Sequence, residues 1–191
     1  MPTIQLTQFA QLNNCSKHSH ISFNYPRPVL SSAVLNGGLV HGQHILNINV
    51  AKQSQTTDSA EQTLQQYGQQ LSLQGPIIGM MTAASMKSLH VATKTLQGVE
   101  LAVVVTSGLS NARHVGDHAE YRSMTTAATE TGTINIVILT SATLNSAAMV
   151  EAVMIATEAK AAALAAAKIL SPVSGQIATG TGTDAIAIVN G

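Results

Sequence analysis

The residues best suited to chemistry lie in a run of alternating threonines and glycines that ends in an aspartate, residues 179–184. The run is not a dinucleotide fingerprint, because that motif opens a helix and has an acidic residue about 20 positions further on. It also lacks the lysine of a phosphate-binding loop. Hydroxyls interleaved with glycines favour a hydrogen-bonding surface with close backbone approach. We expect Thr181 and Thr183 to bind substrate and Asp184 to order the catalytic site; a polar turn before a strand is the alternative.

A second group lies in an alanine-rich stretch without glycine or proline, residues 143–168. Glu158 and Lys160 are two positions apart, so on a helix they point about 200° away from each other. No basic residue lies four positions before or after Glu158, and an unpaired carboxylate on a buried helix is costly. The Glu158 carboxylate must therefore accept hydrogen bonds either from solvent or from a substrate amide. We expect Glu158 to act as general acid–base, and Lys160 to pair with Asp184.

A threonine at the start of an isoleucine-rich run is the candidate nucleophile. Gly132 and Thr133 precede this run. A threonine that self-cleavage exposes at a new N-terminus attacks with its own amine as base. An ordinary strand start is the alternative, and water is the alternative nucleophile.

The histidines offer a competing metal site. His114 and His118 have a spacing that places two imidazoles on one helix face, with Asp117 between them. Gly116 opposes a helix there, and no His-Glu-x-x-His motif is present. We therefore expect neither a metal nor another cofactor, and a zinc-dependent amidase remains the second hypothesis.

The hydrophobic pattern predicts the elements that must position these residues. An apolar periodicity after Asp58, with Glu61 as the partner in a capping box, predicts an amphipathic helix. A long alanine-rich helix is predicted near residues 143–169. Strands are predicted at residues 29–35, 45–50, 77–84, 91–96, 101–105, 134–139 and 184–189. This loose alternation predicts an α+β fold, with a layered mixed sheet and packed helices.

The chain reads as one domain, residues 1–191, because neither a linker nor an internal repeat divides it. Residues 1–25 are weakly patterned, and Cys15 within them is read as an incidental thiol. Residues 108–132 form a long irregular segment, and loops of this length are usually functional or disordered.

Composition excludes several kinds of partner. Nine Lys and Arg residues balance nine Asp and Glu residues. Without a basic patch, nucleic acid is a poor partner. A near-neutral surface favours self-association, so we expect a homo-oligomer. Neither a signal peptide nor an apolar run of membrane-spanning length is evident, so we expect a cytoplasmic protein without a membrane partner.

Taken in order, several segments resemble the adenosylcobinamide amidohydrolase family. The matching segments are residues 30–38, 46–47, 49–50, 81–84, 105–112, 116–117, 132–136, 156–160 and 179–185. The resemblance implies hydrolysis of the amide that joins aminopropanol to the corrinoid. The product would be adenosylcobyric acid, which can re-enter cobalamin synthesis as a salvage step. Family members usually continue past the Gly-Thr-Asp segment into a closing helix, whereas this sequence stops at Gly191.

Amide hydrolysis needs a nucleophile, a proton shuttle and donors for the oxyanion. We expect Asn36, with Gly37, and Asn111 to donate hydrogen bonds to the oxyanion or to the amides of the corrin. The corrinoid is bulky and amide-rich, which suits a broad polar cleft. A fainter likeness to self-processing aminopeptidases and ornithine acetyltransferases implies a layered sandwich with Thr133 as the released nucleophile. A corrinoid-binding protein without catalysis is the remaining alternative.

Overall fold

The computed structural model describes residues 3–50, 58–118 and 132–191. Within these ranges the chain forms one nine-stranded sheet, two α-helices and a short 3-10 turn, Met86–Ser88. The helices are α1 (Ala60–Gln70) and α2 (Ser146–Ala166). The strands are β1 (Thr3–Thr7), β2 (Ala10–Asn14), β3 (His18–Ser31), β4 (Gly38–Asn49), β5 (Ile77–Thr82), β6 (His90–Leu96), β7 (Val99–Ser107), β8 (Ile134–Thr140) and β9 (Ala185–Val189).

The sheet is mixed and built around two crossover units. Its main path runs β1-β2-β3-β9-β8-β7-β6, with β4 beside β3 and β5 beside β4. β4 and β5 are parallel and joined by α1, whereas β8 and β9 are parallel and joined by α2. A helix is the usual connection between parallel neighbours. The predicted α+β class with a layered mixed sheet is therefore confirmed.

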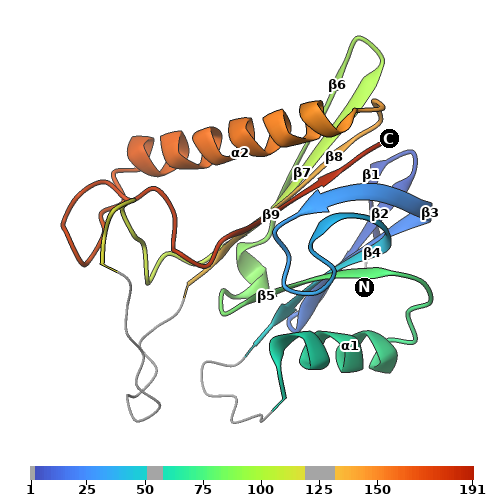
Figure 1. Cartoon of the computed structure of the whole chain (residues 1–191), viewed down its shortest axis with the longest axis horizontal. Helices are drawn as coiled ribbons and strands as arrows, with labels where there is room; N and C mark the ends of the chain where they lie inside the picture. The colour runs from blue at the N-terminus through green and yellow to red at the C-terminus, as the bar shows by residue number, and fades with distance from the viewer. Residues whose placement is uncertain (1–2, 51–57, 119–131) are drawn as a thin grey trace.

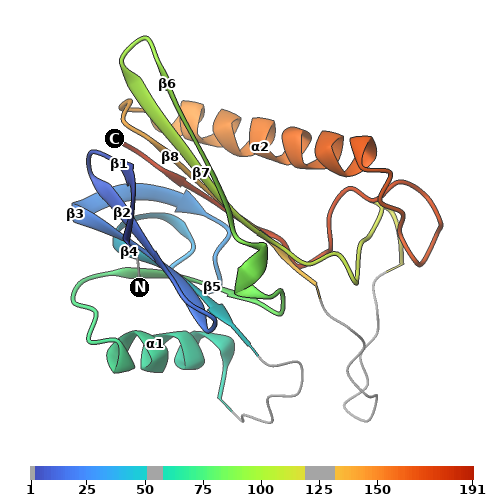
Figure 2. The same ribbon diagram turned by 180° about the vertical axis from the view of Figure 1, so that it is seen from behind.

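The sheet curls so that its two halves face each other, with one helix outside each half (Figures 1 and 2). The bend falls in β3, whose register with β4 shifts between Ser22 and Arg27. Pro26 lies in that gap, where its missing N–H costs no ladder bond. Before the shift β3 pairs with β2, and after it with β9.

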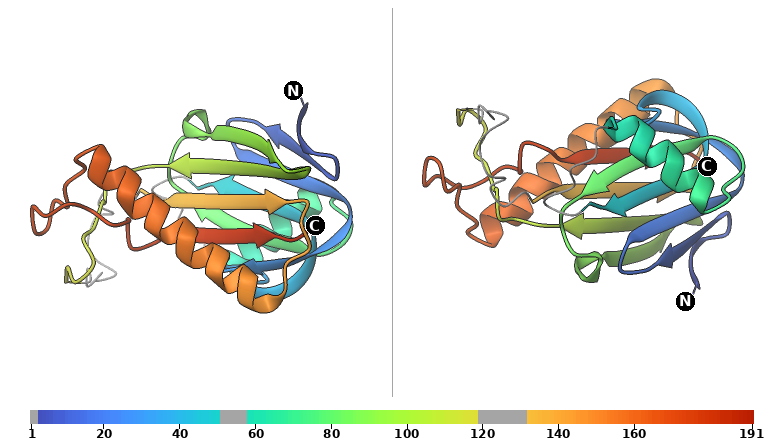
Figure 3. Two further views of the ribbon diagram at one scale, coloured as in Figure 1. Left: turned by 90° about the horizontal axis from the view of Figure 1, so that it is seen from above. Right: turned by 90° about the horizontal axis from the view of Figure 1, so that it is seen from below.

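Packing on both faces explains why β8 reads as a nearly continuous apolar run. Val137 and Leu139 face the inner core between the two halves of the sheet. Ile134 and Ile136 face outward, against the buried side of α2. Seen from above, α2 crosses β8 and β9 diagonally (Figure 3).

The two helices confirm the prediction, with small shifts at their ends. α2 begins after Asn145, whose side chain accepts from Ala148 N at 2.9 Å. α1 is capped by Ser59 with Gln62 rather than by Asp58 with Glu61, so that prediction was one residue early. Ser59 forms the capping box because its short side-chain hydroxyl accepts from the Gln62 N–H. In return, the Gln62 side chain accepts from the Ser59 N–H.

The N-terminal segment is more ordered than its weak pattern indicated. Residues 3–25 contain β1, β2 and the first part of β3, which pair as a meander. Leu12 and Phe23 are buried in the inner core. Within the irregular segment 108–132, residues 119–131 lie outside the described part of the chain. No helix in the described ranges has the length and apolarity to span a membrane.

Candidate active site

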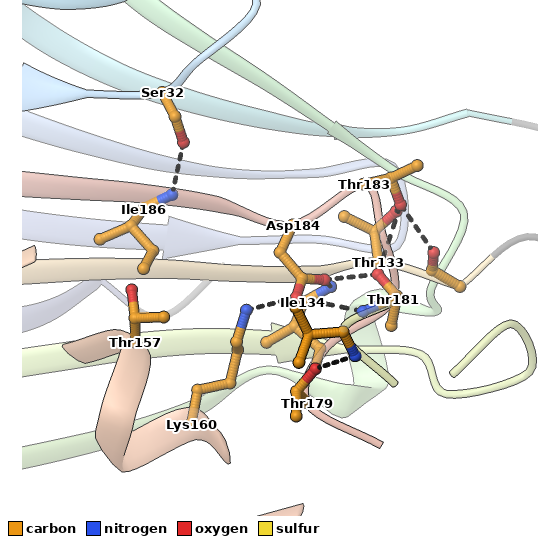
Figure 4. Close-up of polar contacts among 12 residues, drawn as sticks. Ser32, Thr133, Ile134, Thr157, Lys160, Thr179, Thr181, Thr183, Asp184 and Ile186 are labelled. Carbon is orange, nitrogen blue, oxygen red and sulfur yellow. Dashed lines mark hydrogen bonds and ion pairs between the residues drawn. The ribbon is translucent and has the colours of Figure 1, made fainter. Parts of the chain in front are cut away.

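Asp184, just before β9, is the centre of the polar cluster in Figure 4. Its Oδ1 accepts from Ile134 N at 3.0 Å and from the Thr181 hydroxyl. Its Oδ2 accepts from Thr181 N at 3.2 Å and from Lys160 Nζ at 2.6 Å. The side chains of Lys160 and Asp184 are only 12% and 10% exposed. The predicted pairing of these two residues is confirmed, and it fastens α2 to β8 and β9.

Glycine within the threonine run lets the backbone wrap around this carboxylate. A Cβ placed on Gly180 would lie 2.5 Å from Asp184 Oδ2 and 3.1 Å from Lys160 Nζ. Any side chain there would displace the ion pair. Gly182 has φ +77°, a conformation that side chains disfavour.

A chain of hydroxyls leads from Thr133 to the peptide bond on its N-terminal side. Thr133 is buried, and its Oγ1 lies 3.0 Å from Thr183 Oγ1. Thr183 Oγ1 donates to Gly132 O at 3.1 Å. Because a hydroxyl carries one proton, Thr133 donates the proton between the two threonines. Thr183 therefore contacts the hydroxyl of Thr133, the candidate nucleophile. It also contacts the carbonyl oxygen of the Gly132–Thr133 peptide bond.

Asn111 ties this peptide to the threonine run. Its Oδ1 accepts from Gly132 N at 2.6 Å, and its Nδ2 donates to Thr181 O at 3.3 Å. The neighbouring Arg113 N donates to Gly180 O at 2.8 Å. The structure thus brings Asn111, Thr133, Lys160, Thr181, Thr183 and Asp184 together.

The other predicted residues do not contact this cluster. Glu158 is exposed on α2, and among the described residues its carboxylate has no hydrogen-bond partner. This agrees with the 200° separation from Lys160, which faces Asp184. Asn36 and Gly37 are exposed in the turn between β3 and β4, where Asn36 Nδ2 donates to Ile77 O at 2.7 Å. Asn36 has φ +55°, which marks it as a turn residue.

Among the described residues, the geometry around His114 and Asp117 does not form a zinc site. The carboxylate of Asp117 accepts from Ser171 Oγ at 2.5 Å and from His114 N at 2.8 Å. Hydrogen bonds from Ser171 and Ser174, with that of His114 N, lower the pKa of Asp117 to about 2. His114 Nδ1 is 2.8 Å from Ile177 O. In the described ranges, no three His, Cys, Asp or Glu side chains are arranged to hold a metal.

A pocket of about 400 Å³ opens beside the ion pair. It lies between α2, the end of β3 and the start of β9. Its lining residues are Leu30, Ser31, Ser32, Val150, Val153, Thr157, Lys160, Asp184 and Ile186. Sequence reasoning missed Ser32 and Thr157 as site residues, although each lies in a segment that resembles the family.

A buried polar group inside the sheet was also missed. Asn47 Nδ2 donates to Thr106 Oγ1 at 2.9 Å, and Asn135 Nδ2 donates to Asn47 Oδ1 at 2.9 Å. Asn135 lies two positions after Thr133 in the chain. The available signal was an asparagine inside an otherwise apolar run. The three side chains therefore connect β4, in one half of the sheet, with β7 and β8 in the other half.

The fold and the site define an α+β protein whose hydroxyls, carboxylate and ammonium group suit acyl transfer at an amide. A sequence profile described as adenosylcobinamide amidohydrolase matches residues 3–191. The chain therefore belongs to the adenosylcobinamide amidohydrolase family, a family of hydrolases.

One relative, from Methanosarcina mazei, bears the name adenosylcobinamide amidohydrolase. It is 28% identical over 157 residues, which is 82% of this chain and 66% of the relative. The chain thus spans slightly less than two thirds of that relative's length.

Proposed function

We propose that this protein hydrolyses the amide between aminopropanol and the corrinoid in adenosylcobinamide, giving adenosylcobyric acid for cobalamin salvage. The family match over residues 3–191 carries the proposal. The convergence of Thr133 and the threonine run on Asp184 supports it. These groups lie far apart in the sequence and form one polar site.

Thr133 is the proposed nucleophile, released by cleavage of its own peptide bond. In the described part of the intact chain, the Thr133 hydroxyl has the Thr183 hydroxyl as its hydrogen-bond partner, and a hydroxyl is no general base. A free α-amine on Thr133 would supply that base. The Thr183 hydroxyl donates to Gly132 O, where an oxyanion would form during attack on the Gly132 carbonyl carbon.

The bond changes in this release are simple. Thr133 Oγ1 adds to the Gly132 carbonyl carbon while its proton passes to the departing peptide nitrogen, which becomes the Thr133 amine. Water then hydrolyses the resulting ester and leaves Gly132 as a carboxylate. Asn111 assists by holding Gly132 N, and the Lys160–Asp184 pair fixes the loop that carries Thr183.

Mass spectrometry of the purified protein tests the release. We expect two fragments that divide between Gly132 and Thr133, and a single intact chain for Thr133→Val. Thr133→Ser should still divide, because serine keeps the hydroxyl. An undivided parent chain that is fully active would remove Thr133 as a self-released nucleophile and leave water in that role.

Incubation with adenosylcobinamide tests the function itself. We expect adenosylcobyric acid and free aminopropanol in equal amounts by liquid chromatography and mass spectrometry. Retention of the corrinoid without either product would identify a binding protein instead. Neither binding nor product would reject the proposed substrate.

A further inference from the structure

The pocket beside the ion pair presents hydroxyl groups with unused hydrogen-bonding capacity. Ser32 Oγ accepts from Ile186 N at 3.1 Å, so its own proton is available to a bound molecule. Thr157 Oγ1 donates to Val153 O at 2.8 Å, so its lone pairs can accept. Figure 4 shows these two hydroxyls on different elements, Ser32 after β3 and Thr157 on α2. In this pocket, therefore, the Ser32 hydroxyl can donate to a bound molecule and the Thr157 hydroxyl can accept from it.

The ion pair adds donors without adding net charge. Lys160 Nζ carries three protons, and among the described residues only Asp184 takes one. The nearby Asp184 carboxylate cancels most of the attraction that an anion would feel at short range. A neutral group with a strong acceptor therefore suits this pocket better than a carboxylate does.

We propose that this pocket binds a primary carboxamide on a side chain of the substrate, an inference that rests on the proposed function. A carboxamide has one acceptor oxygen and an adjacent nitrogen with two protons. Its oxygen accepts from Ser32 and Lys160, and its nitrogen donates to Thr157. This pattern satisfies the oxygen and one N–H of the carboxamide with groups from three different segments of the chain.

The apolar lining and the size of the pocket agree with such a side chain. Val150, Val153 and Ile186 line the pocket and can contact a methylene stem. A volume of about 400 Å³ holds one amide arm but not a corrin ring. The ring then lies outside, with Val150, which is 52% exposed, at the rim. The pocket thus selects corrinoids whose arm is an amide rather than an acid.

Two conservative variants test this site. Thr157→Val and Ser32→Ala each remove a hydroxyl with little change in shape. For turnover of adenosylcobinamide, we expect each to raise KM roughly 3- to 10-fold, the value of one hydrogen bond, while kcat stays within about twofold. Thr93→Val and Ser16→Ala are matched controls at exposed positions on β6 and before β3. Both controls should keep the parent KM.

Equilibrium dialysis gives a second readout that needs no turnover. Cobinamide and cobyrinic acid, whose side chains are carboxylates, serve as probes. The parent should bind cobinamide more tightly, and Thr157→Val and Ser32→Ala should each reduce that preference by roughly 3- to 10-fold.

The outcomes separate the pocket from the proposed reaction. If both variants keep the parent KM and the parent preference for cobinamide over cobyrinic acid, the carboxamide site is wrong. A fall in kcat alone would also overturn it, because the hydroxyls would then act on the reacting bond. If the parent forms no adenosylcobyric acid, the proposed function fails, and the dialysis preference alone decides whether the pocket binds carboxamides.

Discussion

Among single residues, Asp184 has the widest structural influence on the candidate active site. One carboxylate holds the threonine run, the first N–H of β8 and the ammonium group of α2. Both charged side chains are nearly buried, so neither can be removed without leaving the other in a poorly solvated place. Asp184 therefore has a structural role whatever the reaction is.

Asp184→Asn should lower the free energy of unfolding by about 2–3 kcal/mol, because Lys160 is left as an unpaired, nearly buried charge. Urea unfolding measures the change. Asp58→Asn, at an exposed carboxylate before α1, is the matched control and should stay within about 0.5 kcal/mol of the parent. Equal stability of both variants would show that the ion pair contributes nothing to folding.

Glu158→Gln should leave turnover within about twofold of the parent. The Glu158 carboxylate is exposed, and no described residue holds it in a fixed position. General acid–base groups typically contribute 10²- to 10⁴-fold. Steady-state kinetics would therefore reinstate Glu158 as the proton shuttle if kcat fell by about 100-fold while corrinoid binding persisted.

The sequence could predict those site residues whose partners follow from local geometry. The helical angle between Glu158 and Lys160 already required them to face different surroundings, and the structure places only Lys160 beside Asp184. Ser32 and Thr157 could not be predicted, because their shared pocket depends on the pairing of β3 with β9. That pairing joins segments more than 150 residues apart, which no local pattern reveals.

At the scale of elements, two histidines connect β3 and β4 with the segment after α1. His44 Nε2 lies 2.8 Å from Gln74 O and must donate to that carbonyl, so His44 Nδ1 accepts from His20 Nε2 at 3.1 Å. Burial, then the neighbouring charges of His44 and His18, lower the pKa of His20 from 6.5 to about 4. With its pKa lowered in this way, His20 is neutral near pH 7.

This shift predicts an acid-sensitive contribution to stability. His20 in the unfolded chain takes up a proton near pH 6.5, whereas in the folded chain its pKa is about 4. The free energy of unfolding therefore decreases as the pH drops from 6.5 toward 4. Because His20 is partly exposed, we expect a contribution of about 1–2 kcal/mol. Urea unfolding at pH 7.5 and pH 4.5 should show a smaller acid loss for His20→Gln than for the parent.

His90→Gln, at an exposed position on β6, is the control and should lose stability with acid as the parent does. The pKa of Asp117 is lowered from 3.8 to about 2, so its contribution to stability is lost mainly below pH 4 and hardly enters this comparison. An identical acid loss for His20→Gln and the parent would contradict the assignment.

Elements were predictable where burial covers a whole strand or a helix face. The strand at residues 134–139 and the helix near residues 143–169 appear as β8 and α2 because long apolar or alanine-rich runs have few alternatives. The hydrophobic pattern did not predict β1 and β2, because each strand has only five residues and is mostly polar on one side. Such strands gain their order from the long β3, which lies later in the chain.

At the scale of the whole molecule, β9 holds the two halves of the sheet together. It pairs with β3 of one half and with β8 of the other, and every residue in it is buried. Ile188 lies opposite Leu30 on one side and Ile138 on the other. The last strand of the described chain therefore occupies the centre of the sheet rather than an edge.

Ile188→Ala should accordingly loosen both halves and not only the segment around α2. Ile188 is fully buried, so the cavity should lower the free energy of unfolding by about 3 kcal/mol. Hydrogen exchange measured by mass spectrometry should show faster exchange in β3 and in β8 together. Leu96→Ala, at a side chain 56% exposed on β6, should leave both strands protected. Faster exchange in β8 alone would mean that the two halves are stable separately, and that β9 belongs to one of them rather than joining both.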